Sequence, residues 1–212
     1  MRRSSVVLLS TIGFVVLYLA STFALGTAPK PEDSADKVLA WFRANGSHVR
    51  TWLWLGTLAL MVFMLFAALV RDHLPAVHRD LFLAGAVLLA AESAVQGWLW
   101  AGLAWHAGAV SAANARLVFD IASYWGPVLT GATVLMLGPI AVLGLRGEAR
   151  MPRWLGVVAA VAFVEQLVET ITITGQRGFT APGGAMNLQL GAGLTVIALV
   201  CTGVAVSRAT AS

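Results

Sequence analysis

The chain has 212 residues, of which 58% are apolar and only 11% are charged, with a mean hydropathy of +0.81 and a net charge of +4. Soluble domains carry about 25% charged residues, so this chain has too little polar surface to cover itself in water. Composition excludes an ordinary soluble protein, and the small positive charge indicates membrane topology rather than nucleic-acid binding.

Apolar segments long enough to cross a membrane recur along the whole chain. A membrane-spanning helix needs about 20 mostly apolar residues, and continuous apolar runs favour helices over strands. In chain order the predicted spans are 5–25, 51–70, 81–105, 117–145, 154–175 and 186–207. We therefore predict an all-α fold, a six-transmembrane-helix bundle that forms a single domain over residues 1–212. A slight excess of arginine in alternate loops predicts that both termini are cytoplasmic.

The first span and the loop after it allow two interpretations each. Basic residues before the first span are typical of a signal peptide, but the apolar run is long for one, so we interpret it as a retained anchor. In the loop, Pro31 and Asp33 suit a helix start, an apolar stripe follows, and Gly46 is placed to end the helix. We expect a short amphipathic helix at about 33–45, either lying on the outer membrane surface or covering a cavity in the bundle.

The fourth span contains two Gly-Pro pairs, Gly126-Pro127 and Gly138-Pro139. Each proline removes a backbone hydrogen-bond donor from the helix. We expect a kink or an early helix end at these positions.

Two short patterns carry a resemblance to a known family. One is "MPRWLG" at 151–156, and the other lies in the first loop at Pro31, Asp33-Ser34-Ala35, Val38-Leu39 and Phe42. Together they resemble an uncharacterised family of small polytopic membrane proteins of high-GC bacteria. The resemblance implies an all-helical fold in the bacterial cell membrane. It implies no activity and no functional residues.

Four acidic residues fall inside the predicted spans: Glu92, Asp120, Glu165 and Glu169. Ionisable groups in a membrane are costly and usually face the bundle interior or a wet cavity. No lysine or arginine lies centrally in any span, and burial disfavours a charged carboxylate. We therefore predict that at least one of these acids is neutral at pH 7, which infrared titration of the carboxyl stretch would test.

Helix rise places several polar side chains in the outer half of the bilayer: Gln96, Asp120, Glu169 and Asn187. If their helices face one another, these side chains line one polar pocket beneath the first outer loop. Other arrangements remain open. Asp120 has Arg116 one turn earlier as an ion-pair partner, and Glu92 has Gln96 one turn later as a hydrogen-bond partner.

The acids and tryptophans together favour a membrane-embedded enzyme. A buried carboxylic acid protonates an alkene or epoxide of an isoprenoid, and aromatic rings stabilise the resulting cation. These residue types are similar to those of membrane-bound terpene cyclases, which implies acid-initiated cyclisation or isomerisation, a lyase or isomerase activity. The candidate acids are Glu169 or Asp120, the candidate partners are Glu92 or Glu165, and the candidate aromatic wall is Trp100, Tyr124 and Trp125.

Two further hypotheses stay open. One is a proton- or cation-coupled carrier of small molecules, and the other is a non-catalytic accessory membrane protein. In every case the expected partners are membrane lipids and, for the first two, a hydrophobic or small-molecule substrate. We expect no cofactor, no metal and no nucleic acid.

Overall fold

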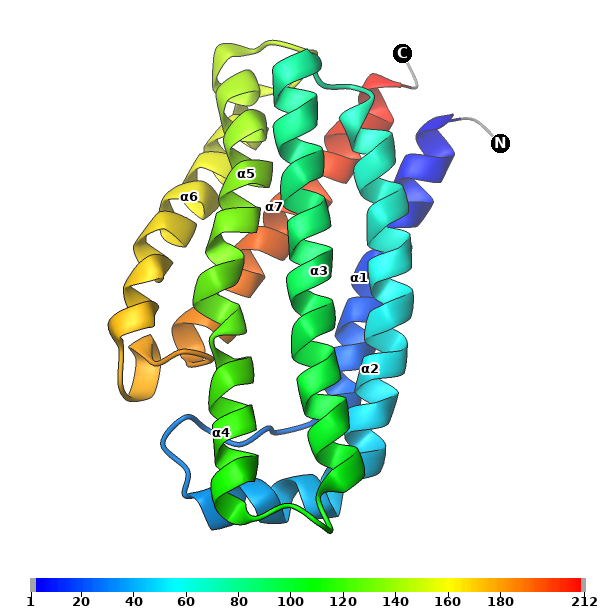
Figure 1. Ribbon diagram of the computed structural model, residues 1–212. Coiled ribbons are helices and arrows are strands. Elements are labelled where there is room, and N and C mark those ends of the chain that lie inside the picture. Colours follow the sequence, from blue (N-terminus) through cyan, green and yellow to red (C-terminus); the bar gives the residue numbers. More distant parts are fainter. Residues whose placement is uncertain (1–2, 211–212) are drawn as a thin grey trace.

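The computed structural model describes residues 3–210, and nearly all of them are helical (Figure 1). The α-helices are α1 (Arg3–Leu25), α2 (Ala35–Arg71), α3 (Ala76–His106), α4 (Ala112–Ser123), α5 (Trp125–Arg146), α6 (Arg153–Glu169) and α7 (Ala192–Ala209). Three short turns of other helix types lie between α6 and α7: the 3₁₀-helices η1 (Thr170–Thr174) and η2 (Gly178–Thr180) and the π-helix η3 (Met186–Gly191). Six stretches are long and apolar enough to span a membrane, and residues 3–210 contain no strand. The predicted all-α six-helix bundle is confirmed.

The helices run up and down between two ends of an elongated bundle (Figure 1). At the terminal end, α1 begins and α7 ends, beside the α2–α3 turn at 72–75 and the α5–α6 loop at 147–152. The Arg3 guanidinium pairs with Asp72 there, and Arg150 donates to the Ala209 carbonyl. At the opposite, distal end lie residues 26–45 and the α3–α4 turn, and the α6–α7 connection lies in the same half of the bundle, at the level of the break between α4 and α5. Which end faces the cytoplasm stays a prediction.

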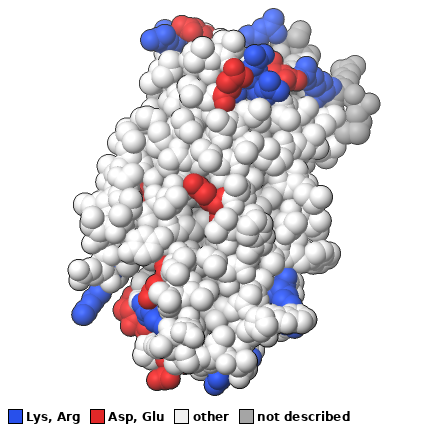
Figure 2. Space-filling model, in the orientation of Figure 1, with Lys and Arg blue, Asp and Glu red and all other residues white. Residues whose placement is uncertain are grey.

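Charged side chains gather at the two ends of the bundle (Figure 2). The broad middle of the visible face is uncharged apart from acidic atoms near mid-height. Many large apolar side chains midway along the spans are exposed, such as Val87, Val128 and Val161. An uncharged apolar band between two charged ends matches the cross-section of a bilayer.

The amphipathic helix of the first loop, expected at about 33–45, is the first segment of α2: it begins at Ala35, and a kink with non-helical backbone angles at Asn45 separates it from the membrane span. Of the two kinks or early ends expected at the Gly-Pro pairs, the first occurs and the second does not. The fourth span breaks at Tyr124, between α4 and α5, just before Pro127. Pro139 lies buried inside α5, and that helix continues to Arg146.

Glycines allow two neighbouring helices to touch through their backbones near the terminal end. A Cβ added to Gly144 of α5 would lie 2.5 Å from Gly156 Cα of α6, and a Cβ on Gly156 would lie 2.2 Å from Leu145 N. Small residues at helix contacts are typical of membrane bundles, where close packing takes the place of hydrophobic burial. The crossing fixes the position of α6, which carries the residues described below.

The first segment of α2 covers the distal end of the bundle. Its apolar stripe, with Val38 and Phe42 wholly buried, packs in one hydrophobic cluster with Trp100 of α3 and Phe119 of α4. The Trp100 ring lies 5.6 Å from Phe42 and 5.9 Å from Phe119, measured between ring centroids. The expected amphipathic helix is therefore present, with its apolar face against the ends of α3 and α4.

A single arginine attaches the start of this segment to α4. Arg116 donates to the backbone carbonyls of Pro31 and Asp33 and pairs with Asp120 at 2.8 Å. A hydrogen bond from the Lys37 side chain, and to a lesser extent one from the Lys30 backbone N–H, holds the pKa of the Asp33 carboxyl below its usual value. The loop before α2 is thus held by charge-assisted bonds at the membrane surface.

We expect Arg116→Ala to release this loop and destabilise the protein by about 2 kcal/mol, since hydrogen bonds to charged groups are each worth about 1.5–3 kcal/mol before solvent screening. Thermal unfolding in detergent, followed by tryptophan fluorescence, measures the loss. Arg50→Ala is the matched control, because no hydrogen bond or ion pair is described for the exposed Arg50 side chain. Equal midpoints for the two variants would contradict the attachment.

Candidate functional site

A buried polar cluster lies where α6 ends, and Glu169 is at its centre. The Glu169 side chain is 3% exposed, and both of its oxygens accept hydrogen bonds from amides. Asn187 Nδ2 donates to Oε1 at 2.5 Å, and Gln166 Nε2 donates to Oε2 at 2.7 Å. A carboxyl with a donor on each oxygen, sealed from solvent, is held in one orientation.

Gln166 joins the two glutamates of α6. The same Nε2 atom that bonds Glu169 also lies 2.9 Å from Glu165 Oε2, and Gln166 Oε1 accepts from the Thr133 hydroxyl of α5. Gln166 is itself 2% exposed. Gln166 therefore links Glu165 and Glu169 in one hydrogen-bonded unit. We call the two glutamates the carboxyl pair.

Asn187 closes the cluster from the last span. Its Nδ2 also donates to Thr172 Oγ1 at 3.2 Å, and its Oδ1 accepts from the Gly183 backbone N–H at 2.9 Å. Thr172 and Asn187 are both buried. The expected proximity of Glu169 and Asn187 is thus what the structure shows.

The backbone departs from α-helical geometry on both sides of Glu169. The 3₁₀-helix η1 follows it directly, and the π-helix η3 carries Asn187. Single π-turns inside helices occur frequently at functional sites. Two glycines leave room for the side chains: a Cβ on Gly191 would lie 1.7 Å from Glu169 Oε2, and one on Gly126 would lie 2.7 Å from Asn187 Cγ.

Glu165 lies at the boundary between the buried cluster and the lipid-facing surface. Its neighbours Val164 and Val168 are each 56% exposed, whereas Ala162 and Gln166 are buried. The Glu165 side chain is half-buried, and its Oε1 atom is covered without a hydrogen-bond partner. A covered oxygen without a partner is unusual in native structures. It leaves one acidic oxygen of the pair uncommitted, beside the bilayer.

The other two acids in the spans lie apart from this pair. Asp120 pairs with Arg116 at the distal surface, which is one of the alternatives that the sequence left open. Glu92 lies on α3, and α3 packs against α5 and not against α6, which carries the carboxyl pair. The Oε2 atom of Glu92 is covered and has no hydrogen-bond partner. Figure 1 shows α5 between α3 and α6. Within residues 3–210, no three His, Cys, Asp or Glu side chains come together closely enough to hold a metal ion. The structure does not gather the four acids into one pocket.

The remaining predicted residues are also distributed. Gln96 is half-buried on α3, and no side-chain hydrogen bond is described for it. Trp100 belongs to the aromatic cluster beneath α2, and Tyr124 is 46% exposed. Trp125 directly precedes Gly126, which contacts Asn187, and its indole N–H is covered without a partner. Of the three aromatic residues expected to form a wall, only Trp125 is next in sequence to a residue, Gly126, that packs against the polar cluster.

Sequence reasoning missed Gln166, Thr133 and Gly191. A signal for Gln166 existed, since it stands between the two glutamates in "FVEQLVET" and lies three residues before Glu169. On a helix, spacings of three and four both place side chains on one face. The roles of Thr133 and Gly191 depend on contacts between spans, which have no local signal.

Comparison with protein-family models, with curated proteins and with solved structures finds no match to this chain.

Proposed function

We propose that the protein performs acid–base chemistry on a lipid-soluble substrate, with the carboxyl pair as its proton donor and acceptor. The observation that carries the proposal is the hydrogen-bonded pair itself. One of its members, Glu169, is sealed in the bundle, and the other, Glu165, lies beside the hydrocarbon with an uncommitted oxygen. A substrate dissolved in the bilayer approaches the half-buried Glu165 from the side, without a water-filled entry path. Because its free oxygen is covered, the Glu165 side chain turns outward to meet the substrate.

Within the pair, Glu165 both donates and recovers the proton, and Glu169 positions Glu165. Glu165 gives its proton to a substrate carbon or oxygen, and loss of a proton from a neighbouring carbon returns one to the same carboxylate. The overall result is isomerisation or cyclisation, with no change in composition. Gln166 and Asn187 hold Glu169, which orients Glu165 through the shared amide. An isoprenoid with an alkene or epoxide is the substrate class that this chemistry suits.

We expect purified protein in nanodiscs, incubated in D₂O with isoprenoids, to place deuterium on substrate carbon. The probes are the alkenes squalene and geranylgeraniol, whose protonation forms a carbon–deuterium bond, and mass spectrometry detects the label even when the product equals the substrate. Glu165→Gln and Glu169→Gln each should lower the labelling rate by about 100-fold or more, which is the usual contribution of a positioned acid or base.

Glu92→Gln is the matched control, because it changes an acid of another span that is not bonded to the pair. Asp120→Asn tests the separate expectation that Asp120 is the acid, and we expect it to retain turnover. Labelling that survives both Glu165→Gln and Glu169→Gln would remove the pair from the reaction. No labelling of any probe would leave the carrier or the accessory protein as the better proposals.

A proton-coupled carrier is the second candidate, and the two non-α turns favour it. Discontinuous helices beside a buried carboxyl are typical of transporters, where freed backbone groups bind the coupling ion. In proteoliposomes loaded with pyranine, added Na⁺ should then change the internal pH with the wild type and not with Glu169→Gln. An unchanged pyranine signal with wild-type protein would count against Na⁺–proton exchange.

A further inference from the structure

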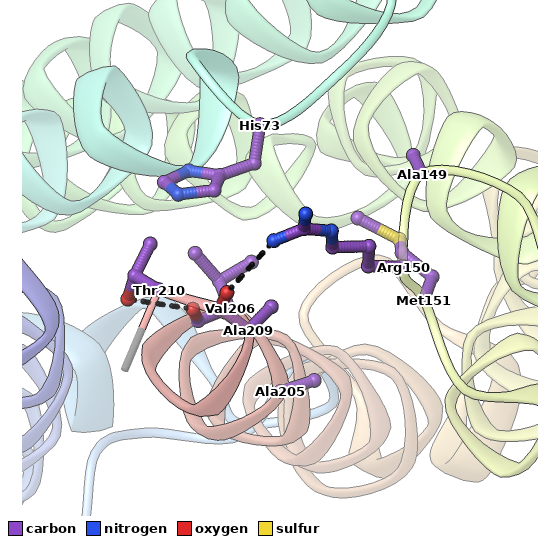
Figure 3. Close-up of a pocket in the computed structure, with 8 residues that line it drawn as sticks. All are labelled: His73, Ala149, Arg150, Met151, Ala205, Val206, Ala209 and Thr210. Carbon is purple, nitrogen blue, oxygen red and sulfur yellow. Dashed lines mark hydrogen bonds between the residues drawn. The ribbon is translucent and has the colours of Figure 1, made fainter. Parts of the chain in front are cut away.

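The terminal end contains a hollow that is separate from the carboxyl pair. It has a volume of about 440 Å³ and lies between the α2–α3 turn, the α5–α6 loop and the end of α7 (Figure 3). Its floor is apolar and includes Met151 and Val206, and its polar groups are chiefly those of His73 and Arg150. Among residues 3–210, no Asp or Glu lines it. A hollow lined by an arginine, with no acidic side chain among these residues, is suited to an anion.

Arg150 is placed over this hollow by an unusual backbone. Both Ala149 and Arg150 adopt left-handed conformations, with φ of 51° and 56°. Residues other than glycine rarely adopt this conformation, and such residues cluster at ligand-binding and active sites. Figure 3 shows the Arg150 side chain reaching from the loop toward the end of α7, opposite the His73 ring.

The Arg150 guanidinium has donors to spare. Its one described hydrogen bond goes to the Ala209 carbonyl at 3.5 Å, the outer limit for such a bond, and no carboxylate pairs with it among residues 3–210. By contrast, Arg3 and Arg79 at the same end each pair with an aspartate. A guanidinium offers five N–H donors in a planar fork that matches phosphate oxygens.

His73 provides a second contact from the other side of the hollow. Its Nδ1 lies 2.9 Å from the Leu69 carbonyl, which can only accept, so Nδ1 carries a proton. That bond fixes the ring, and in the imidazolium form of the ring Nε2–H is the donor that a phosphate oxygen would accept. Since the carbonyl end of α7 repels anions, a ligand would contact Arg150 and His73 rather than that helix end.

A smaller adjoining hollow extends the cationic surface. It has a volume of about 340 Å³, shares Arg150, Ala205 and Ala209 with the first, and adds Arg208 and Trp154. Trp154 is 47% exposed, as is typical of tryptophan at a membrane surface. Basic pockets between membrane helices, at the level of the headgroups, bind anionic lipids.

We propose that these two hollows form a binding site for a phosphate group, with Arg150 and Arg208 as its main ligands and His73 as a third. The phosphate belongs either to an anionic phospholipid headgroup or to a soluble phosphate compound. The site is independent of the carboxyl pair, which lies toward the distal end.

Native mass spectrometry of the full chain tests this proposal. Delipidated protein in neutral detergent is titrated with phosphatidylglycerol, with phosphatidylcholine as the uncharged comparison, and separately with inorganic phosphate. Wild-type protein should bind phosphatidylglycerol preferentially. Arg150→Gln combined with Arg208→Gln should weaken that binding roughly 30-fold, from the loss of two arginine charges near the membrane surface. His73→Gln should weaken it less.

Arg79→Gln is the matched control, because Arg79 is a half-buried arginine in the first turn of α3, at the same end of the bundle, that pairs with Asp80. Preference for phosphatidylglycerol that depends on Arg150 and Arg208 supports the lipid source. Saturable binding of inorganic phosphate with the same dependence supports the soluble source. Absence of both, or an equal loss in the Arg79 variant, overturns the site. Glu169→Gln should bind phosphatidylglycerol like the wild type, which separates this test from that of the proposed function.

Discussion

Gly156→Ala is expected to lower the stability of the bundle by about 3 kcal/mol, toward the upper end of the range for overpacked cores. The added methyl group would lie 2.2 Å from Leu145 N and 2.5 Å from Gly144 C. Both are backbone atoms of α5, so no side-chain rotation relieves the contact. The α5–α6 pair must separate, and the close packing that stabilises membrane helices against each other is lost. Thermal unfolding in detergent should show a lower midpoint.

Gly131→Ala is the control for this substitution. Gly131 is also in a membrane helix, α5, but a Cβ there meets nothing within 4 Å. Alanine is the better helix former by about 0.8–1 kcal/mol in water, so this variant should be unchanged or slightly more stable. If Gly156→Ala lowers the unfolding midpoint and Gly131→Ala does not, the loss of stability comes from the α5–α6 contact. A similar small change in both would show that α5 and α6 tolerate separation.

The number and order of the spans could be predicted because membrane helices depend on local composition. A run of about 20 apolar residues must form a helix in lipid to satisfy its own backbone. The ends of the helices were harder to predict. The first-loop helix and the second span meet directly at the kink at Asn45, with no loop between them, so the second span begins several residues before the predicted start at 51. Asn45 Nδ2 donates to the Trp41 carbonyl beside the bend.

The candidate site could be predicted only in part. The unusual feature, two carboxyls in an apolar run, was visible, and so was Asn187 at the same depth. The direction that each side chain faces was not, because neighbouring helices determine it. Spacing placed Glu165 and Glu169 on one face, yet the buried face of α6 runs through Ala162, Gln166 and Glu169, and Glu165 lies at its edge. The non-α turns beside Glu169 likewise depend on the contacts with Asn187 and Gly191.

Gly191→Ala should disrupt the carboxyl pair directly, because the added Cβ would lie 1.7 Å from Glu169 Oε2 and 2.7 Å from Gln166 Nε2. The carboxyl is the flexible end of its side chain, so it can move, but only by giving up the Gln166 hydrogen bond in a sealed site. A buried polar group that loses a hydrogen-bond partner costs up to about 3 kcal/mol. We expect a destabilisation of that size, together with the loss of any activity that depends on Glu169.

A second substitution tests whether the Glu169 carboxyl causes the destabilisation expected for Gly191→Ala. In a Glu169→Ala background the obstructing carboxyl is absent, so Gly191→Ala should cost much less than it does in the wild type, with a coupling free energy of about 2 kcal/mol between the two positions. Gly193→Ala is the control in the same span, since a Cβ there meets nothing within 4 Å. Additive effects of Gly191→Ala and Glu169→Ala would mean that the methyl group acts on the π-helix backbone instead. Gly191 would then be needed for the backbone of η3, and the position of the Glu169 carboxyl would follow from that backbone.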